Sequence, residues 1–128
     1  MKKVWVIVLF AMVLAACQES LEDRCEREAK EYTAKNCPAK MDSNLRIDSL
    51  TFDRKTHTLH YHYTMTDFAD RPGVLEAAGA EDLLRKELKN TTTMKTYKDQ
   101  GYNFRYTYRS EKDPKTIRLD VTFTKKDY

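Results

Sequence analysis

The chain has 128 residues, of which 23 are Lys or Arg and 20 are Asp or Glu, so its formal net charge is +3 at pH 7. A chain of this length builds one small domain with a modest core, and its balanced charge, without a basic block, argues against nucleic acid as a partner. With three glycines and no Gly-x-Ser-x-Gly motif, the sequence lacks the loop chemistry of a serine hydrolase, and we expect no enzyme.

The chain begins with a strong export pattern. Lys2 and Lys3 precede an uncharged apolar run over residues 4–14, and two small alanines follow it. This order is typical of a secretory signal peptide. The run is too short to span a bilayer, which takes roughly 20 apolar residues. We therefore expect residues 1–16 to be removed on export.

The stretch Leu14-Ala15-Ala16-Cys17 resembles the lipobox of bacterial lipoproteins. In that family the cysteine thiol receives a diacylglycerol and the peptide is cut before it, so the resemblance implies lipidation of Cys17. Two or more acyl chains hold a protein stably on a membrane without spanning it. In the family's sorting rule, a residue other than aspartate after the cysteine, here Gln18, favours the outer membrane. The resemblance thus implies a lipid-anchored envelope protein and leaves open whether it faces the periplasm or the surface.

The folded domain is predicted to begin shortly after the lipid acceptor, so that residues 17–19 form a short tether and residues 20–128 a single domain. Ser20 and Asp23 have the spacing of a capping box at a helix start, and Pro38 ends the helix near residue 36. The apolar residues of this helix recur on one face: Leu21, Cys25, Ala29 and Tyr32.

Cys25 and Cys37 are the two cysteines left once Cys17 carries lipid. The oxidising envelope favours a disulfide between them. A continuous helix through both would instead keep their α-carbons about 18 Å apart, beyond the roughly 7 Å that a disulfide allows. The sequence leaves both alternatives open, because a bridge requires the helix to end by Thr33.

Beyond the first helix the period of the apolar residues changes from 3.6 to 2, as in strands with one buried face. Four such runs form two hairpins, each closed by a turn-prone segment. A second helical pattern lies between the hairpins, runs from Ala77 to Leu88 and extends toward Gly101 as its stop. The predicted strands cover residues 50–52, 59–65, 104–109 and 117–123.

The predicted order is therefore helix, hairpin, helix, hairpin (αββαββ). Strands that are apolar on one face need an element to cover that face, and two amphipathic helices supply it. The expected fold class is α+β, a two-layer sandwich with a four-stranded, mostly antiparallel sheet.

The other face of the predicted sheet is polar. Strict alternation places Arg105, Thr107 and Arg109 on it. In one interpretation the face is simply solvated, since threonine is a good strand former. In the other it docks an envelope protein or glycan, because the arginine guanidinium binds carboxylates through paired hydrogen bonds. The candidate partner-binding residues are Arg105, Arg109, Arg118, His60 and His62.

His60 and His62 also suggest an alternative function. Two imidazoles on one strand face lie about 6 to 7 Å apart along the backbone and could ligate zinc or copper in a small-ligand or metal-binding lipoprotein. A metal site needs three or four ligands, and Asp120 completes one only if its strand is adjacent. We therefore predict neither a metal nor another cofactor.

Three stretches resemble small uncharacterised lipoproteins of gut Bacteroidota: Asn36-Cys37-Pro38, Leu59-His60-Tyr61-His62-Tyr63 and Tyr102-Asn103-Phe104-Arg105-Tyr106-Thr107-Tyr108. This resemblance implies no particular activity. Together with the lipobox, it favours a membrane-anchored, non-enzymatic binding or accessory module whose partner is an envelope protein or glycan. An assembly accessory, an inhibitor and an immunity protein all fit this description.

Overall fold

The computed structural model describes residues 19–128. The predicted signal peptide over residues 1–16 and the predicted lipid acceptor Cys17 lie outside the described residues. Within them the elements are, in chain order, α2 (Leu21–Asn36), β1 (Ala39–Asp42), β2 (Leu45–Asp53), β3 (Thr58–Met65), the 3-10 turn η1 (Asp67–Ala69), α3 (Val74–Ala77), α4 (Ala80–Asn90), α5 (Lys95–Asp99), β4 (Asn103–Ser110) and β5 (Ile117–Phe123).

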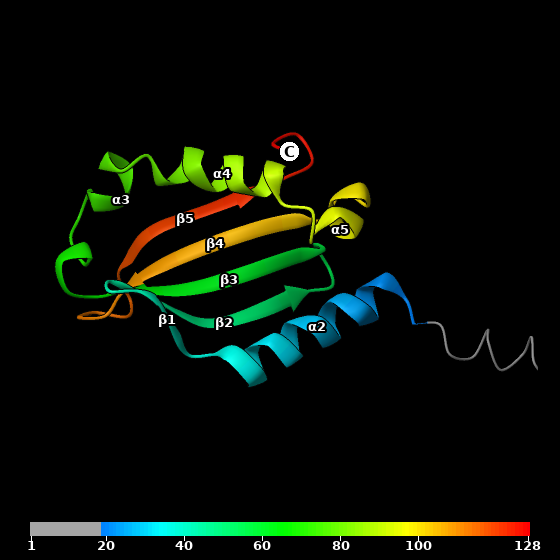
Figure 1. Ribbon diagram of the computed structural model, residues 1–128, viewed down its shortest axis with the longest axis horizontal. Helices are drawn as coiled ribbons and strands as arrows, with labels where there is room; N and C mark the ends of the chain where they lie inside the picture. Colours follow the sequence, from blue (N-terminus) through cyan, green and yellow to red (C-terminus); the bar gives the residue numbers. More distant parts are fainter. Residues whose placement is uncertain (1–18) are drawn as a thin grey trace, which may run out of the picture.

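The strands of the described residues form one sheet in the order β1-β2-β3-β4-β5. Neighbouring strands are antiparallel except β3 and β4, which run parallel. The long connection between these two strands carries η1 and the helices α3, α4 and α5 (Figure 1). The α+β class and the mostly antiparallel sheet are thereby confirmed.

The prediction of four strands is wrong, because the described residues form five. The additional strand, β1, pairs antiparallel with the first half of β2 at the edge of the sheet. It has only four residues and is mostly exposed, so it lacks the apolar alternation that marked the others. The second predicted helix is divided as well. Gly79, with φ +66°, separates α3 from α4 in a backbone conformation that favours glycine.

Helix α2 follows the predicted pattern closely. The Ser20 side chain caps it by accepting a hydrogen bond from the Asp23 N–H at 3.1 Å. The helix packs against β2, where the Thr33 hydroxyl donates to the Leu50 carbonyl and accepts from the Leu50 N–H, both at 2.9 Å. Cys25 and Ala29 lie on its buried face.

Cys25 and Cys37 are free thiols, and the alternative of a disulfide between them is not realised. The reason is the length of α2, which continues through Thr33 to Asn36 with Cys37 as its C-cap. At 1.5 Å per residue the helix holds the two residues about 18 Å apart. Cys25 is instead a core residue, 1% exposed, and burial raises the pKa of its thiol to about 12.

One face of the sheet carries the core. Helices α2 and α4 both pack on this face, because Cys25 and Ala29 of α2 and Leu88 of α4 belong to the same buried cluster as the inward strand residues. Figure 1 shows α2 along the β2 side of the sheet and α4 along the β5 side. The inward strand residues of this cluster are Leu50, Leu59, Met65, Phe104, Tyr106, Tyr108 and Phe123.

Candidate functional site: a tyrosine-floored groove

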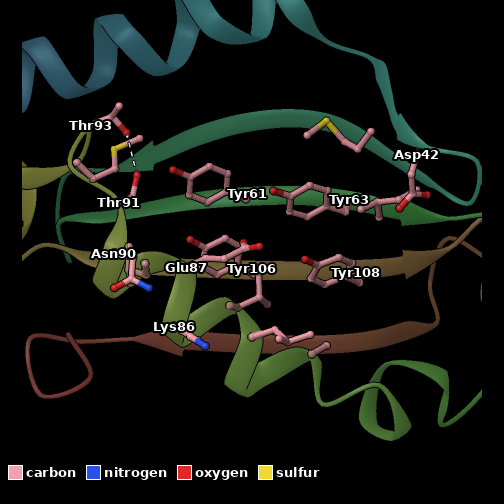
Figure 2. Close-up of a pocket in the computed structure, with 17 residues that line it drawn as sticks. Asp42, Tyr61, Tyr63, Lys86, Glu87, Asn90, Thr91, Thr93, Tyr106 and Tyr108 are labelled. Carbon is pink, nitrogen blue, oxygen red and sulfur yellow. Dashed lines mark hydrogen bonds between the residues drawn. The ribbon is translucent and has the colours of Figure 1, made fainter.

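A groove of about 980 Å³ opens on the core face of the sheet, and we call it the tyrosine groove. Strands β3 and β4 form its floor, α4 forms one wall, and residues of β1 and the start of β2 form the opposite edge (Figure 2). Such a volume is typical of ligand-binding clefts. The floor residues are Tyr61, Tyr63, Tyr106 and Tyr108.

The four tyrosines of the floor are arranged by strand alternation and by the parallel register of β3 and β4. That register sets Tyr61 beside Tyr106 and Tyr63 beside Tyr108. The ring centroids of these two pairs are 4.8 and 4.7 Å apart, with interplanar angles of 6° and 11°. Each ring therefore stacks on a neighbour, which stabilises the floor beyond simple burial.

The hydroxyls of these tyrosines remain available for binding. Among residues 19–128 none of the four has a hydrogen-bond partner, and none is fully buried. Figure 2 shows all four leaning along the groove toward the end that holds Asn90 and Thr91. Burial raises the pKa of Tyr106 to about 12 and raises the pKa values of the other three as well. The floor thus offers neutral groups that can both donate and accept hydrogen bonds.

Exposed apolar side chains line the rims of the groove. Met41 on β1 is 53% exposed and Leu83 on α4 is 56% exposed. Beyond Tyr108 the surface continues into a smaller hollow of about 400 Å³ lined by Leu45 and Leu75 among others. The groove therefore combines apolar walls with hydrogen-bonding groups on its floor, the composition of a binding site.

The opposite, outer face of the sheet holds most of the site residues proposed from the sequence, and there they bind one another. Arg105 donates to both carboxylate oxygens of Asp120, at 2.8 and 2.5 Å. Thr107 donates to the same carboxylate at 2.9 Å and contacts the His60 ring nitrogen Nε2 at 2.6 Å. Thr107 is 0% exposed, so the expectation of a solvated threonine at this position is wrong.

His62 and Arg109 extend this outer-face network. The His62 Nε2 lies 3.0 Å from the Thr51 hydroxyl, and its Nδ1 lies 3.3 Å from Arg109. Within residues 19–128 no three His, Cys, Asp or Glu side chains are placed to hold a metal ion. Both nitrogens of His62 and the Nε2 of His60 are engaged with threonine or arginine.

Arg118 does not share a surface with Arg105 and Arg109, which corrects its predicted place. The register of β4 and β5 shifts between Tyr108 and Arg109, and Ile117 rather than Arg118 lies opposite Arg109. Arg118 instead contacts Asp70 at 3.0 Å, with side-chain exposures of 16% and 0%. Ile117, the first apolar residue of the predicted strand 117–123, is 50% exposed at this shift.

Asp70, in the loop after η1, is the centre of this buried cluster. Its carboxylate also accepts hydrogen bonds from the Ser110 hydroxyl at 2.8 Å and from the Lys112 N–H at 3.1 Å. Burial alone would raise the pKa of Asp70, but these bonds and Arg118 together hold it below its ordinary value. The cluster joins the loop after β3 to the β4–β5 turn and is structural rather than open to a partner.

Alternation along the predicted strands 59–65 and 104–109 puts the four floor tyrosines on the inward row, for which the sequence favours core packing. The groove above these tyrosines is not predictable from the sequence, because the gap between α4 and the β1 edge depends on how far apart these elements lie in space. The fifth strand widens the sheet on that side. Nothing in the sequence marks the exposed Met41 and Leu83, because neither belongs to a motif.

No helix of residues 19–128 is both long and apolar enough to cross a membrane. No curated protein matches the chain in sequence. Solved structures of similar fold include a candidate secreted protein of Pseudomonas aeruginosa, with 14% identity, a TM-score of 0.71 and coverage of 86% of this chain and 98% of that one.

Two further structures are pilotins. AspS, a pilotin of the type II secretion system of Vibrio cholerae, has 17% identity and a TM-score of 0.58, over 90% of this chain and 98% of that one. EpsS, the pilotin of the type 2 secretion system of Vibrio vulnificus, has 15% identity and a TM-score of 0.57, over 84% and 90%. At these identities the likeness shows the fold alone. In sequence, residues 20–119 match the model of a domain of unknown function, DUF8479, and the chain belongs to that family.

Proposed function

We propose that this protein is a non-enzymatic accessory lipoprotein of the cell envelope that holds a protein partner in the tyrosine groove. Cys17 would carry the lipid, and the tether to Ser20 is so short that it reaches only about 10 Å at full extension. The folded domain would therefore work close to the membrane surface, with the outer membrane favoured by Gln18.

One feature of the tyrosine groove carries the proposal: exposed apolar side chains line its rims, and its floor holds tyrosine hydroxyls that have no hydrogen-bond partner within residues 19–128. Met41 and Leu83 expose more than half of their surface, and apolar side chains gathered at a cleft are typical of interaction sites. The outer face is a weaker candidate, since Arg105 is paired with Asp120 and Arg118 with Asp70.

The fold comparisons support the same function. Two of the similar structures are pilotins, which are components of type II secretion systems. This fold therefore occurs in at least two proteins that belong to a secretion system. A fold can serve unrelated functions, and the groove therefore remains the main argument.

Lysine substitutions on the rims of the groove are expected to weaken partner binding. In Met41→Lys and Leu83→Lys, a partner that buries these rims must desolvate a lysine, and chemical crosslinking in native envelopes should recover it at least about ten-fold less well. The free energy of unfolding should change by about 0.5 kcal/mol or less, because both side chains are exposed. The yield of the crosslinked complex, compared with wild type, measures the effect.

Ile117→Lys is the matched control, since Ile117 is 50% exposed and lies outside the groove. It should crosslink as wild type does. Equal recovery of the partner with all three variants would contradict the proposed site.

A further inference from the structure

The outer face of β3 carries a close pair of histidines directly behind the groove floor. His60 and His62 flank Tyr61 in the sequence and point away from it, and their ring centroids are only 3.7 Å apart. Both rings are half-buried. The pair bridges β3 to β4 on one side, through Thr107 and Arg109, and β3 to β2 on the other, through Thr51.

The hydrogen bonds assign the proton on His60. The Thr107 hydroxyl has one proton, which it donates to the Asp120 carboxylate at 2.9 Å. At its 2.6 Å contact with His60, Thr107 must therefore accept, and His60 Nε2 carries the hydrogen. His60 Nε2–H is thus the head of a chain of hydrogen bonds that runs through Thr107 and Asp120 to Arg105. A further proton would enter at Nδ1 and charge a ring whose centroid lies 3.7 Å from that of His62.

The hydrogen-bond partners of His62 fix its tautomer as well. Arg109 can only donate, so the His62 Nδ1 that faces it at 3.3 Å must be an unprotonated acceptor. Neutral His62 then carries its hydrogen on Nε2 and donates it to the Thr51 hydroxyl at 3.0 Å. Protonation at Nδ1 would replace this acceptor with a donor and set an imidazolium against a guanidinium.

The charges around the pair disfavour its protonation. Arg105 and Arg109 face both rings from β4, and a charge on His62 further lowers the pKa of His60. Asp120 on β5 and Asp48 on β2 compensate in part. Burial is the largest cause that lowers the pKa of His60, to about 4, and it also lowers the pKa of His62. Asp48 is itself engaged with Arg46 and Thr64.

We propose that His60 and His62 form an acid-sensitive latch across β2, β3 and β4, closed when both are neutral, and that opening it loosens the groove floor and weakens partner binding. The second half of this inference rests on the proposed function. The physical link is direct, because Tyr61 and Tyr63 alternate with these histidines along β3, and Tyr106 and Tyr108 flank Thr107 on β4. A strand cannot shift one face without shifting the other.

The sign of the pH dependence follows from the direction of the shifts. Histidines whose pKa is lower in the folded state than the ordinary 6.5 bind protons preferentially when unfolded, so folding is favoured above pH 6.5 and weakened as the pH falls toward 4. Between pH 7.5 and 5.5, His60 alone should reduce the ratio of folded to unfolded protein about ten-fold, and both histidines by up to about 100-fold.

The test compares urea denaturation and hydrogen exchange of the β3 and β4 amides at pH 7.5 and 5.5, a window above the range in which most carboxylates titrate. The variant is His60→Gln/His62→Gln, whose amides can donate to the same threonines but do not titrate. The control is His57→Asn. His57 lies outside the pair, and its positive φ of 53° is one that asparagine tolerates.

In the wild type and the control, acidification should reduce the ratio of folded to unfolded protein at least about ten-fold and speed amide exchange in β3 and β4. The double glutamine variant should lose most of this pH dependence. Equal dependence in the double variant would overturn the latch. Should that variant fail to fold, the histidine ring resonances of the wild type decide by NMR. Both latch histidines must then titrate below pH 6.5, and ordinary titration of either would overturn the proposal.

The link between the latch and partner binding is tested by chemical crosslinking in native envelopes at the same two pH values. The wild type should lose partner recovery at pH 5.5, and the double variant should not. If the wild type loosens in acid but recovers its partner equally at both pH values, the link is wrong while the groove remains the binding site. If the wild type recovers no partner even at pH 7.5, the proposed function itself fails and the inferred link fails with it.

Discussion

Arg118→Ala is expected to reduce the free energy of unfolding by about 3 to 5 kcal/mol, because it leaves a buried carboxylate without its counter-charge. Asp70 is 0% exposed, so water cannot replace the lost guanidinium. Ser110 and the Lys112 N–H still bond the carboxylate but carry no charge. Urea denaturation at neutral pH measures the loss.

Arg105→Ala is the comparison for this prediction. Arg105 likewise forms an ion pair, with Asp120 and through two hydrogen bonds, but the two side chains are 41% and 29% exposed. Exposed pairs contribute about 1 kcal/mol or less. If Arg105→Ala is as destabilising as Arg118→Ala, burial does not determine the strength of these pairs, and the structural role given to Asp70 is wrong.

Tyr108→Ala is expected to cost about 3 to 5 kcal/mol, since it removes a 6% exposed aromatic ring that stacks on Tyr63 in the groove floor. Tyr108→Phe should cost about 0.5 kcal/mol or less, because the hydroxyl has no partner among the described residues. Thermal unfolding of both variants gives the comparison. A large loss in the phenylalanine variant would mean that the hydroxyl is bonded within the protein and is not free for a ligand.

Local sequence signals predicted the elements well wherever one side chain or one period determines them. Ser20 caps α2 as expected, and the apolar alternation of β3, β4 and β5 identifies the core face, with Phe104 and Phe123 almost fully buried. These features depend on neighbours within a few residues, which the sequence displays directly.

Features that depend on pairing between strands were not predicted. The register shift near Arg109 turns Arg118 toward Asp70, and no local pattern marks such a shift. Strand alternation predicts that Thr107 is outward and solvated, yet the side chains of His60 and Asp120 bond to it and bury it. The short strand β1 is defined only by its pairing with β2. A groove is likewise a property of elements brought together, so the sequence alone favours the outer face as the binding site.

Site-specific photo-crosslinking tests the central claim, that the tyrosine groove holds a protein partner, most directly. A photoreactive amino acid at position 83 lies on the rim of the groove, and one at position 122 lies exposed on the outer face of β5. In native envelopes we predict that one identified envelope protein is crosslinked from position 83 and not from position 122. Crosslinking of a protein from position 122 alone would contradict the account and assign the interface to the outer face.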